Sequence, residues 1–394
     1  MKRFLSVAML LCVVTVLAGV LSLKTVGAKD ATASGQILLT RLNSLSCGKW
    51  SVVSAPHPNV SSDLSAVAVV SASDAWAVGS AGNQASGAQT LIEHWNGTNW
   101  QIVTSPSPGS FYNILYGVTA ISASNVWAVG FDAGNSGATQ TLVEHWNGTS
   151  WSAVTSPSPA SINNELFSVA AVSASNIWAV GFATINSGQT PTDETLIEHW
   201  NGTAWSVVKS PSPGSNDHLN GVAAISASDV WAVGNANTFG QTLIERWNGS
   251  QWNVVKSASA GSSSDLRDVA VVSASNVWAV GYALIGSSIQ TFTEHWNGTG
   301  WQAVKSPNIG SSPAFSGVAA ISASDVWAVG SDLNSSNNFQ TLTERWNGSA
   351  WSIVASPNQD TISAQLLGVA ALSATDVWAV GHAGSNPLIE HFHC

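Results

Sequence analysis

Seven equivalent glutamates are the first residues to consider for acid–base chemistry. Each is followed by His or Arg, and they are Glu93, Glu144, Glu198, Glu245, Glu294, Glu344 and Glu390. A catalytic carboxyl pair needs two different environments, so that one carboxyl is protonated while the other is ionised. Seven copies in one repeated context lack this asymmetry. We therefore expect these glutamates to belong to the scaffold, as buried ion pairs or as hydrogen-bond partners of a turn. Each unit also has an Asp or Asn in its Ser-Ala-Ser-Asp/Asn turn, such as Asp74 or Asn125. We expect the side chain of this residue to bond the backbone of its own turn.

Acids outside the repeated positions are weaker catalytic candidates. A carbohydrate-active hydrolase or lyase would draw on Asp217, Glu165, Asp265 or Asp268. The three-arginine clamp of sialidases is missing, because Arg267 is the one arginine outside the N-terminal segment and the repeated positions. No Gly-x-Ser-x-Gly, His-Glu-x-x-His or phosphate-binding glycine loop is present. We interpret the chain as non-enzymatic and expect no cofactor.

A metal site is the other chemistry that the sequence suggests. His391, His393 and Cys394 lie close together at the end of the chain. His391 occupies a position that is His or Arg in every unit, and the three residues lack a recognisable ligand spacing. We therefore expect no metal ion.

The elements that must position these residues are set by a repeat. The string Ser-Ala-Ser/Thr-Asp/Asn-x-Trp-Ala-Val-Gly occurs seven times, and Glu-His/Arg-Trp-Asn-Gly-Thr/Ser-x-Trp follows it six times. All 20 tryptophans fall in three repeat positions. In the fourth repeat unit, for example, the pattern predicts strands over 221–225, 230–233, 242–247 and 252–255, with an Asn-Gly hairpin turn before the last strand. Seven such units predict an all-β, seven-bladed β-propeller of four-stranded blades.

The two ends of the repeat region predict how the ring closes. The last unit lacks a fourth strand, and residues 47–56 match the fourth strand of the other units. We expect the N-terminal strand to pair with the C-terminal blade. Cys47 and Cys394 would then meet, and a disulfide between them would fasten the ring in an oxidising compartment.

The N-terminus indicates export. Lys2 and Arg3 precede an apolar run from Phe4 to Leu23, and small residues precede a possible cleavage after Ala28. The run is also long enough to be an uncleaved anchor. The expected organisation is a signal peptide or anchor over 1–28, a leader over 29–46 and a propeller over 47–394, in a secreted or cell-surface protein.

At its Trp-Ala-Val-Gly and His-Trp-Asn-Gly-Thr-x-Trp motifs the chain resembles a group of secreted bacterial propellers, over residues 47–394. More distantly it is similar to tectonin-type lectin repeats, which carry a related Val-Trp-x-Val strand. The chain departs from WD-repeat proteins, which have Gly-His and Trp-Asp pairs, and it lacks the Ser-x-Asp-x-Gly-x-x-Trp box of sialidases. The resemblance implies the propeller fold.

Function is expected where the repeat varies, on the face that carries the second-to-third loops and the links between blades. Directly after Trp-Ala-Val-Gly the candidates are Phe131, Phe182, Tyr282 and His382, and near the channel mouth they are Tyr116, Phe167, Asn220, Arg267 and Asp268. Exposed aromatic rings among uncharged polar residues suit a sugar. Packing of the long loops is the other explanation for the same rings.

Composition restricts the partners. Charged residues make up only 9% of the chain and no basic run occurs, which excludes a nucleic-acid partner. The main hypothesis is a monomeric extracellular binding module for a glycan or cell-wall polymer. The alternative is a scaffold for an extracellular protein, and a membrane is involved only if the N-terminal segment is an anchor.

Overall fold

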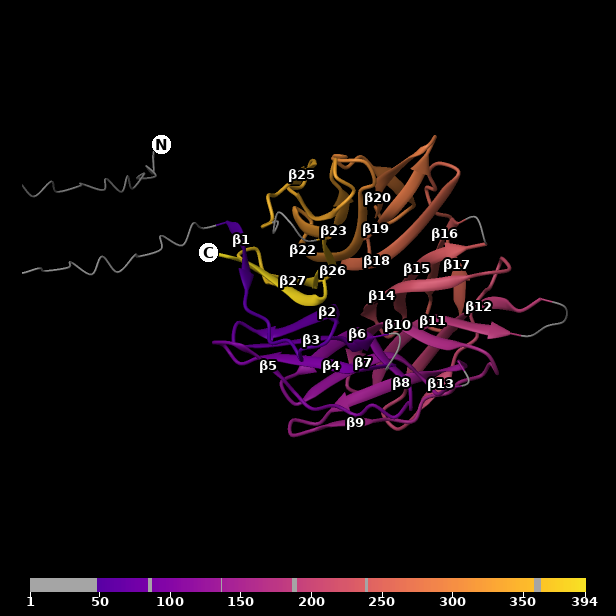
Figure 1. Cartoon of the computed structure of the whole chain (residues 1–394). Coiled ribbons are helices and arrows are strands. Elements are labelled where there is room, and N and C mark those ends of the chain that lie inside the picture. The colour runs from indigo at the N-terminus through magenta and orange to yellow at the C-terminus, as the bar shows by residue number, and fades with distance from the viewer. Residues whose placement is uncertain (1–47, 84–86, 136, 186–189, 238–239, 358–362) are drawn as a thin grey trace, which may run out of the picture. The chain divides into compact units, whose positions relative to one another are not determined.

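The computed structural model describes residues 48–394, except 84–86, 136, 186–189, 238–239 and 358–362. Within this part of the chain every regular element is a β-strand. The 28 strands form blades of four antiparallel strands that follow one another in chain order (Figure 1). Blades one and two are joined into one eight-stranded sheet by a single parallel bridge between Ala88 and Tyr112. The prediction of an all-β, seven-bladed propeller is confirmed.

Each blade consists of a first, second, third and fourth strand. The first strands are β2 (Ser62–Ser71), β6 (Tyr112–Ser122), β10 (Asn164–Ser173), β14 (His218–Ser226), β18 (Ser263–Ser273), β22 (Ala314–Ser322) and β26 (Ala364–Ser373). The second strands are β3 (Asp74–Asn83), β7 (Asn125–Ala133), β11 (Asn176–Ile185), β15 (Asp229–Ala236), β19 (Asn276–Ile285), β23 (Asp325–Leu333) and β27 (Asp376–Ala383). The third strands are β4 (Gly87–Trp95), β8 (Thr139–Trp146), β12 (Thr192–Trp200), β16 (Gln241–Trp247), β20 (Ser288–Trp296), β24 (Phe339–Trp346) and β28 (Asn386–His393). The fourth strands are β5 (Trp100–Ile102), β9 (Trp151–Ala153), β13 (Trp205–Val207), β17 (Trp252–Val254), β21 (Trp301–Val304), β25 (Trp351–Ile353) and β1 (Lys49–Val53).

The first strands form the inner wall of the ring. Each contacts the first strand of the next blade, and β26 contacts β2 to complete the circle. Small residues make this approach possible. A Cβ atom added to Gly221 in β14 would lie 2.8 Å from the Cα atom of Asp268 in β18. The inner strands are therefore rich in glycine and alanine because their backbones lie side by side.

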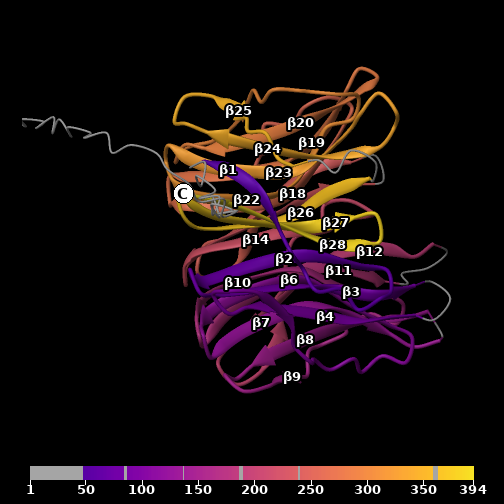
Figure 2. The same cartoon turned by 60° about the vertical axis from the view of Figure 1, so that its left-hand side comes forward.

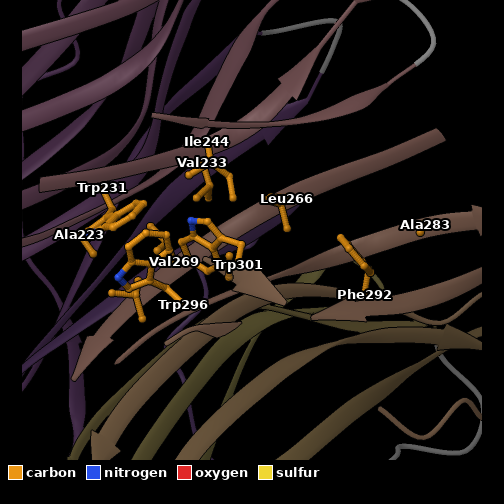
Figure 3. Close-up of a cluster of buried hydrophobic side chains, with 12 residues drawn as sticks. Ala223, Trp231, Val233, Ile244, Leu266, Val269, Ala283, Phe292, Trp296 and Trp301 are labelled. Atoms are coloured by element: carbon orange, nitrogen blue, oxygen red, sulfur yellow. The ribbon is translucent and has the colours of Figure 1, made fainter. Parts of the chain in front are cut away.

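Tryptophans fill the wider gaps between blades. The indole of Trp231 in blade four lies 5.0 Å from Trp296 and 5.3 Å from Trp301 of blade five, measured between ring centroids (Figure 3). Val233 and Leu266 belong to the same buried cluster. Because aromatic pairs at such distances add to the stabilisation from burial, these contacts help to hold neighbouring blades together.

The ring closes as the sequence predicts. Strand β1 pairs antiparallel with β28 (Figure 2). In this register Trp50 lies opposite Phe392. Trp50 also contacts Trp327 of blade six, with ring centroids 5.3 Å apart. Thus β1 supplies the tryptophan that the fourth strand supplies in every other blade.

The disulfide between Cys47 and Cys394 stays a prediction, because Cys47 lies outside the described residues. The residues beside the two cysteines do meet: the Gly48 amide donates to the His393 carbonyl oxygen at 3.3 Å. Peptide mapping under non-reducing conditions tests the pairing.

The Asn-Gly turns between third and fourth strands form as expected. In blade four the Asn248 Oδ1 atom accepts hydrogen bonds from the amides of Ser250 and Gln251, both at 3.0 Å. Gly249 has a φ of 92°, which glycine adopts without steric cost. An asparagine side chain and a glycine therefore form this turn in blades one to six.

Candidate functional site

Every first strand carries a β-bulge at the same place, near its first residue. In blade one the pairing with the second strand slips between Leu64 and Ala66. A bulge inserts one extra residue and redirects its side chain. The seven bulged residues differ between blades: they are Ser65, Tyr116, Phe167, Asn220, Arg267, Ser316 and Leu367.

All seven bulged residues line one cavity of about 580 Å³ inside the ring of first strands. Small-molecule sites usually have volumes of about 300–1,000 Å³. Five residues that the sequence singled out are brought together here, namely Tyr116, Phe167, Asn220, Arg267 and Asp268. We call this cavity, with its lining residues and the side chains directly behind them, the channel site.

An aromatic row occupies blades two to four of the channel site. The ring centroid of Tyr116 lies 5.3 Å from that of Phe167, which lies 5.6 Å from Phe182. Phe182 in turn stacks on His218 at 4.3 Å. Tyr116 and Phe167 are half-buried and line the cavity, so part of each ring is available to a ligand.

Phe131 and Phe182 do not line the cavity, and the expectation that they are exposed is wrong. Each is only 8% exposed. Phe131 packs beside Tyr116 with centroids 5.9 Å apart, and Phe182 packs between Phe167 and His218. For these two rings the packing explanation holds.

The other two candidates of the second strands are half-buried and do not line the cavity. The Tyr282 ring lies 5.4 Å from the Arg267 guanidinium carbon, at a cation–π distance. His382 lies opposite Gln365 of the first strand and Pro387 of the third strand. Tyr282 thus supports a lining residue, whereas His382 lies on the side of the ring where the bulged residue is Leu367.

Blades four and five supply a charged and amide-bearing part of the channel site. Nη2 of Arg267 lies 3.0 Å from Oδ2 of Asp265. Nδ2 of Asn220 donates to Oδ1 of Asp265 at 2.8 Å and to the Leu266 carbonyl at the same distance. Burial raises the pKa of Asp265, while the nearby charges of Arg267 and His218 oppose this rise.

Asp268 joins two blades rather than facing the cavity with free oxygens. Its Oδ1 accepts from the Val269 amide at 2.8 Å, and its Oδ2 accepts from the Val318 amide of blade six at 2.9 Å. Burial raises the pKa of Asp268 to about 7, and the two amide bonds act against this rise. In blade three Ser168 has the same role, because its hydroxyl accepts from the Val222 amide at 3.2 Å.

Three further polar residues of the channel site were not singled out from the sequence. Asp63 lines the cavity, and His218 pairs with Asp193 at 2.8 Å. Asp63 and His218 occupy the position two residues before the bulge, where Glu165 and Asp265 also stand. The residue type at this position differs from blade to blade, and this variation in the sequence could have marked Asp63 and His218 as candidates. The pairing with Asp193, which comes from the third strand of blade three, carried no such signal.

Comparison with known proteins gives a fold and no family. No family model matches the chain, and no curated protein is similar to it in sequence. The solved structure of YCF48 bound to D1 peptide has a TM-score of 0.55 at 12% identity, covering 89% of this chain and 97% of that one. YCF48 from Cyanidioschyzon merolae has a TM-score of 0.54 at 14% identity, covering 88% and 99%. The extracellular domain of BT4673 from B. thetaiotaomicron has a TM-score of 0.52 at 8% identity, covering 87% of this chain and 39% of that one. These structures are propeller-like, and the similarity is one of fold.

The seven repeated glutamates are buried in the scaffold, with 0% exposure each. Four accept hydrogen bonds from a serine that follows the preceding blade, as in Ser306 Oγ to Glu344 at 2.9 Å and Ser356 Oγ to Glu390 at 2.6 Å. The bonds of Ser156 to Glu198 and of Ser257 to Glu294 are equivalent. Burial raises the pKa of Glu93 and Glu144 to about 8 and that of Glu245 to about 9. The glutamates thus belong to the scaffold, and four of them have hydroxyl partners where ion pairs were one expectation.

The His or Arg after each glutamate pairs with the Asp or Asn of the turn. The expectation that this Asp or Asn bonds the backbone of its own turn is therefore wrong. Asp occurs opposite both arginines, as in Arg246 to Asp229, where two bonds of 2.8 Å form. Histidines face either Asn or Asp, as in His145 to Asn125 at 2.9 Å and His391 to Asp376 at 2.8 Å. The reason is register, because each His or Arg lies opposite the Trp of the second strand, and the Asp or Asn stands two residues before this Trp on the same face of the sheet.

The remaining candidate for acid chemistry, Asp217, is fully buried and bonded to its own loop. It accepts from the Ser212 hydroxyl at 2.9 Å and from the Gly214 amide at 2.7 Å. In the described residues no group of three or more His, Cys, Asp or Glu could hold a metal ion. Within the same ranges no helix has the length and apolar character needed to cross a membrane.

Proposed function

We propose that the chain is an extracellular, non-enzymatic binding module that holds a carbohydrate in the channel site. The observation that supports this most directly is the ring of bulges. It places the half-buried rings of Tyr116 and Phe167 in one cavity with Asn220, Arg267 and Asp63. A sugar offers an apolar ring face for stacking and hydroxyls for such polar groups.

The proposal includes the organisation expected from the sequence. Residues 1–28 would direct export as a signal peptide or remain as an anchor, 29–46 would be a leader, and 47–394 would be the monomeric binding unit. The basic start and the apolar run from Phe4 to Leu23 support export. N-terminal sequencing of the exported protein distinguishes a cleaved signal from an anchor.

A glycan and cell-wall polysaccharide binding screen tests the function. The purified protein is compared with a Tyr116→Ala/Phe167→Ala variant, which removes both rings from the cavity while leaving the buried Phe131 and Phe182 in place. We expect a loss of affinity of about tenfold or more, since an aromatic contact contributes on the order of 1 kcal/mol. Leu367→Ala is the matched control, because it truncates a bulged residue on the non-aromatic side.

Binding that survives the double substitution would remove the channel site from the proposal. Binding to none of the glycans would contradict the carbohydrate hypothesis. A protein ligand is the second candidate, favoured by the propeller-like YCF48 structure, which has a peptide bound. The same variant, tested on a peptide array, distinguishes this candidate through loss of peptide binding.

A further inference from the structure

Besides Asp268, whose oxygens are bonded to backbone amides, two carboxyl groups of the channel site have no cation beside them in the described part of the chain. Asp63 accepts hydrogen bonds only from neutral groups, the Ser80 hydroxyl at 2.8 Å and the Ser65 hydroxyl at 3.4 Å. Glu165 stands at the equivalent position in blade three but does not line the cavity. It likewise has a neutral partner, the Thr139 hydroxyl, and burial raises its pKa to about 7. By contrast, Asp265 pairs with Arg267. The negative charge of the site is therefore compensated on one side only.

Tyr116 lies between the two uncompensated carboxylates. Asp63 is on the first strand of blade one, Tyr116 on that of blade two and Glu165 on that of blade three, and these strands contact one another in this order. Burial raises the pKa of the Tyr116 hydroxyl, and the charges of Glu165 and Asp63 raise it further. Both carboxylates thus act electrostatically on the same aromatic residue.

An aromatic ring flanked by two carboxylates is a site suited to an organic cation. The ring face attracts a positive charge through its quadrupole, and each carboxylate accepts hydrogen bonds from N–H donors. Phe167 adds a second ring, 5.3 Å from Tyr116. The cavity is large enough for a sugar residue, and the whole chain has 22 acidic against 12 basic residues, which favours the approach of cations.

We infer that the ligand carries an ammonium group, which binds at Tyr116 between Asp63 and Glu165. This inference rests on the proposed function and narrows it to a class of carbohydrate, the amino sugars whose amine is free. An N-acetylated sugar of the same ring structure lacks the charge and would leave both carboxylates uncompensated. Arg267 and Asn220, on the other side of the cavity, remain available for hydroxyl groups.

Calorimetric titration with two matched oligosaccharides tests the inference. One is a tetramer of β-1,4-linked glucosamine, and the other is its fully N-acetylated counterpart. We expect the free amine to bind more tightly by about tenfold or more, the size of one desolvated cation–π contact with its carboxylate partners. In an Asp63→Asn/Glu165→Gln variant this preference should disappear, while any affinity for the acetylated tetramer is kept.

Glu194→Gln is the matched control, since it removes one carboxylate from an exposed position in blade three and should keep the preference. Equal affinities, or tighter binding of the acetylated tetramer, would overturn the inference while the carbohydrate proposal stands. A preference that survives the Asp63→Asn/Glu165→Gln substitution would also overturn it, because general attraction to an acidic protein would then explain the binding. If no glycan binds at all, the proposed function fails and the inference fails with it.

Discussion

The two ends of each first strand differ in what the seven blades share. At the end that leads into the Ser-Ala-Ser turn, the blades repeat one arrangement, in which a His or Arg of the third strand bonds an Asp or Asn of the second strand, as in Arg345 and Asp325. At the other end the bulged residue changes from blade to blade, from Ser65 to Tyr116 to Arg267. Repetition at one end holds the ring together, so the other end can vary without changing the fold.

Carboxyl groups show the same division. Glu93, Glu144 and Glu245 of the repeat are fully buried, and burial raises their pKa values. At the channel site, Asp265 has a cation as its partner, and Asp63 is half-buried next to a cavity. The scaffold acids thus lie out of reach of solvent, whereas Asp63 lies where a ligand in the cavity can reach it.

The largest expected effect concerns the scaffold carboxyls and pH. The pKa values of Glu93 and Glu144 are about 8 and that of Glu245 is about 9, against an ordinary value of 4.5. Between pH 7 and 9 the unfolded chain has released these protons while the folded chain still holds part of them. The free energy of unfolding therefore falls as the pH rises, by at most about 1.4 kcal/mol per pH unit for each carboxyl.

Denaturant unfolding at pH 7, 8 and 9 measures this slope. A Glu93→Gln/Glu144→Gln/Glu245→Gln variant, which carries neutral amides at the same places, should show a smaller decrease. Stability that rises over this range in the unsubstituted protein would show that the three carboxyls are ionised in the folded state.

The next largest effect concerns the closure of the ring. Trp50→Ala removes a buried indole that contacts Trp327 and Phe392, and it should cost about 3–5 kcal/mol of unfolding free energy. Trp205→Ala in blade three should cost a similar amount, because Trp205 has the same position in an uninterrupted blade. Val52→Ala, at a residue that is 42% exposed in the same strand as Trp50, is the control with little effect. A much smaller loss for Trp50→Ala than for Trp205→Ala would mean that closure adds little to stability.

The smallest expected effect concerns two hydrogen bonds between first strands of neighbouring blades. Asp268→Ala leaves the Val318 amide without its carboxylate and should cost about 1–3 kcal/mol. Ser168→Ala removes a neutral hydroxyl from the Val222 amide and should cost about 1 kcal/mol. Thermal unfolding of both variants shows which substitution costs more stability. The reverse order would show that Asp268 is present for the cavity and not for the contact between blades.

The fold could be predicted from the sequence because the same residue pattern occurs in seven repeat units. Even the pairing of β1 with β28 followed from one missing strand and one spare strand. The sequence did not predict the bulge, since a slip in register leaves no mark in residue types. Phe131 was therefore expected on the surface, although it packs beneath Tyr116. The pair of Asp193 and His218 was missed because it joins the third strand of blade three to the first strand of blade four, and the sequence does not show which side chains of neighbouring blades meet.

The pairing of β1 with β28 has a consequence for how fast the native state is reached. The Ser51 hydroxyl donates to the His391 carbonyl oxygen at a sequence separation of 340 residues. Contacts so distant along the chain slow folding, because a large loop must close before they give any stabilisation. Until then β1 has no partner and β28 has an open edge, which another chain could occupy. A circular permutant that starts at residue 58, with β1 joined behind β28, would hold blade seven as one continuous hairpin series. It should refold faster and aggregate less while reaching the same ring.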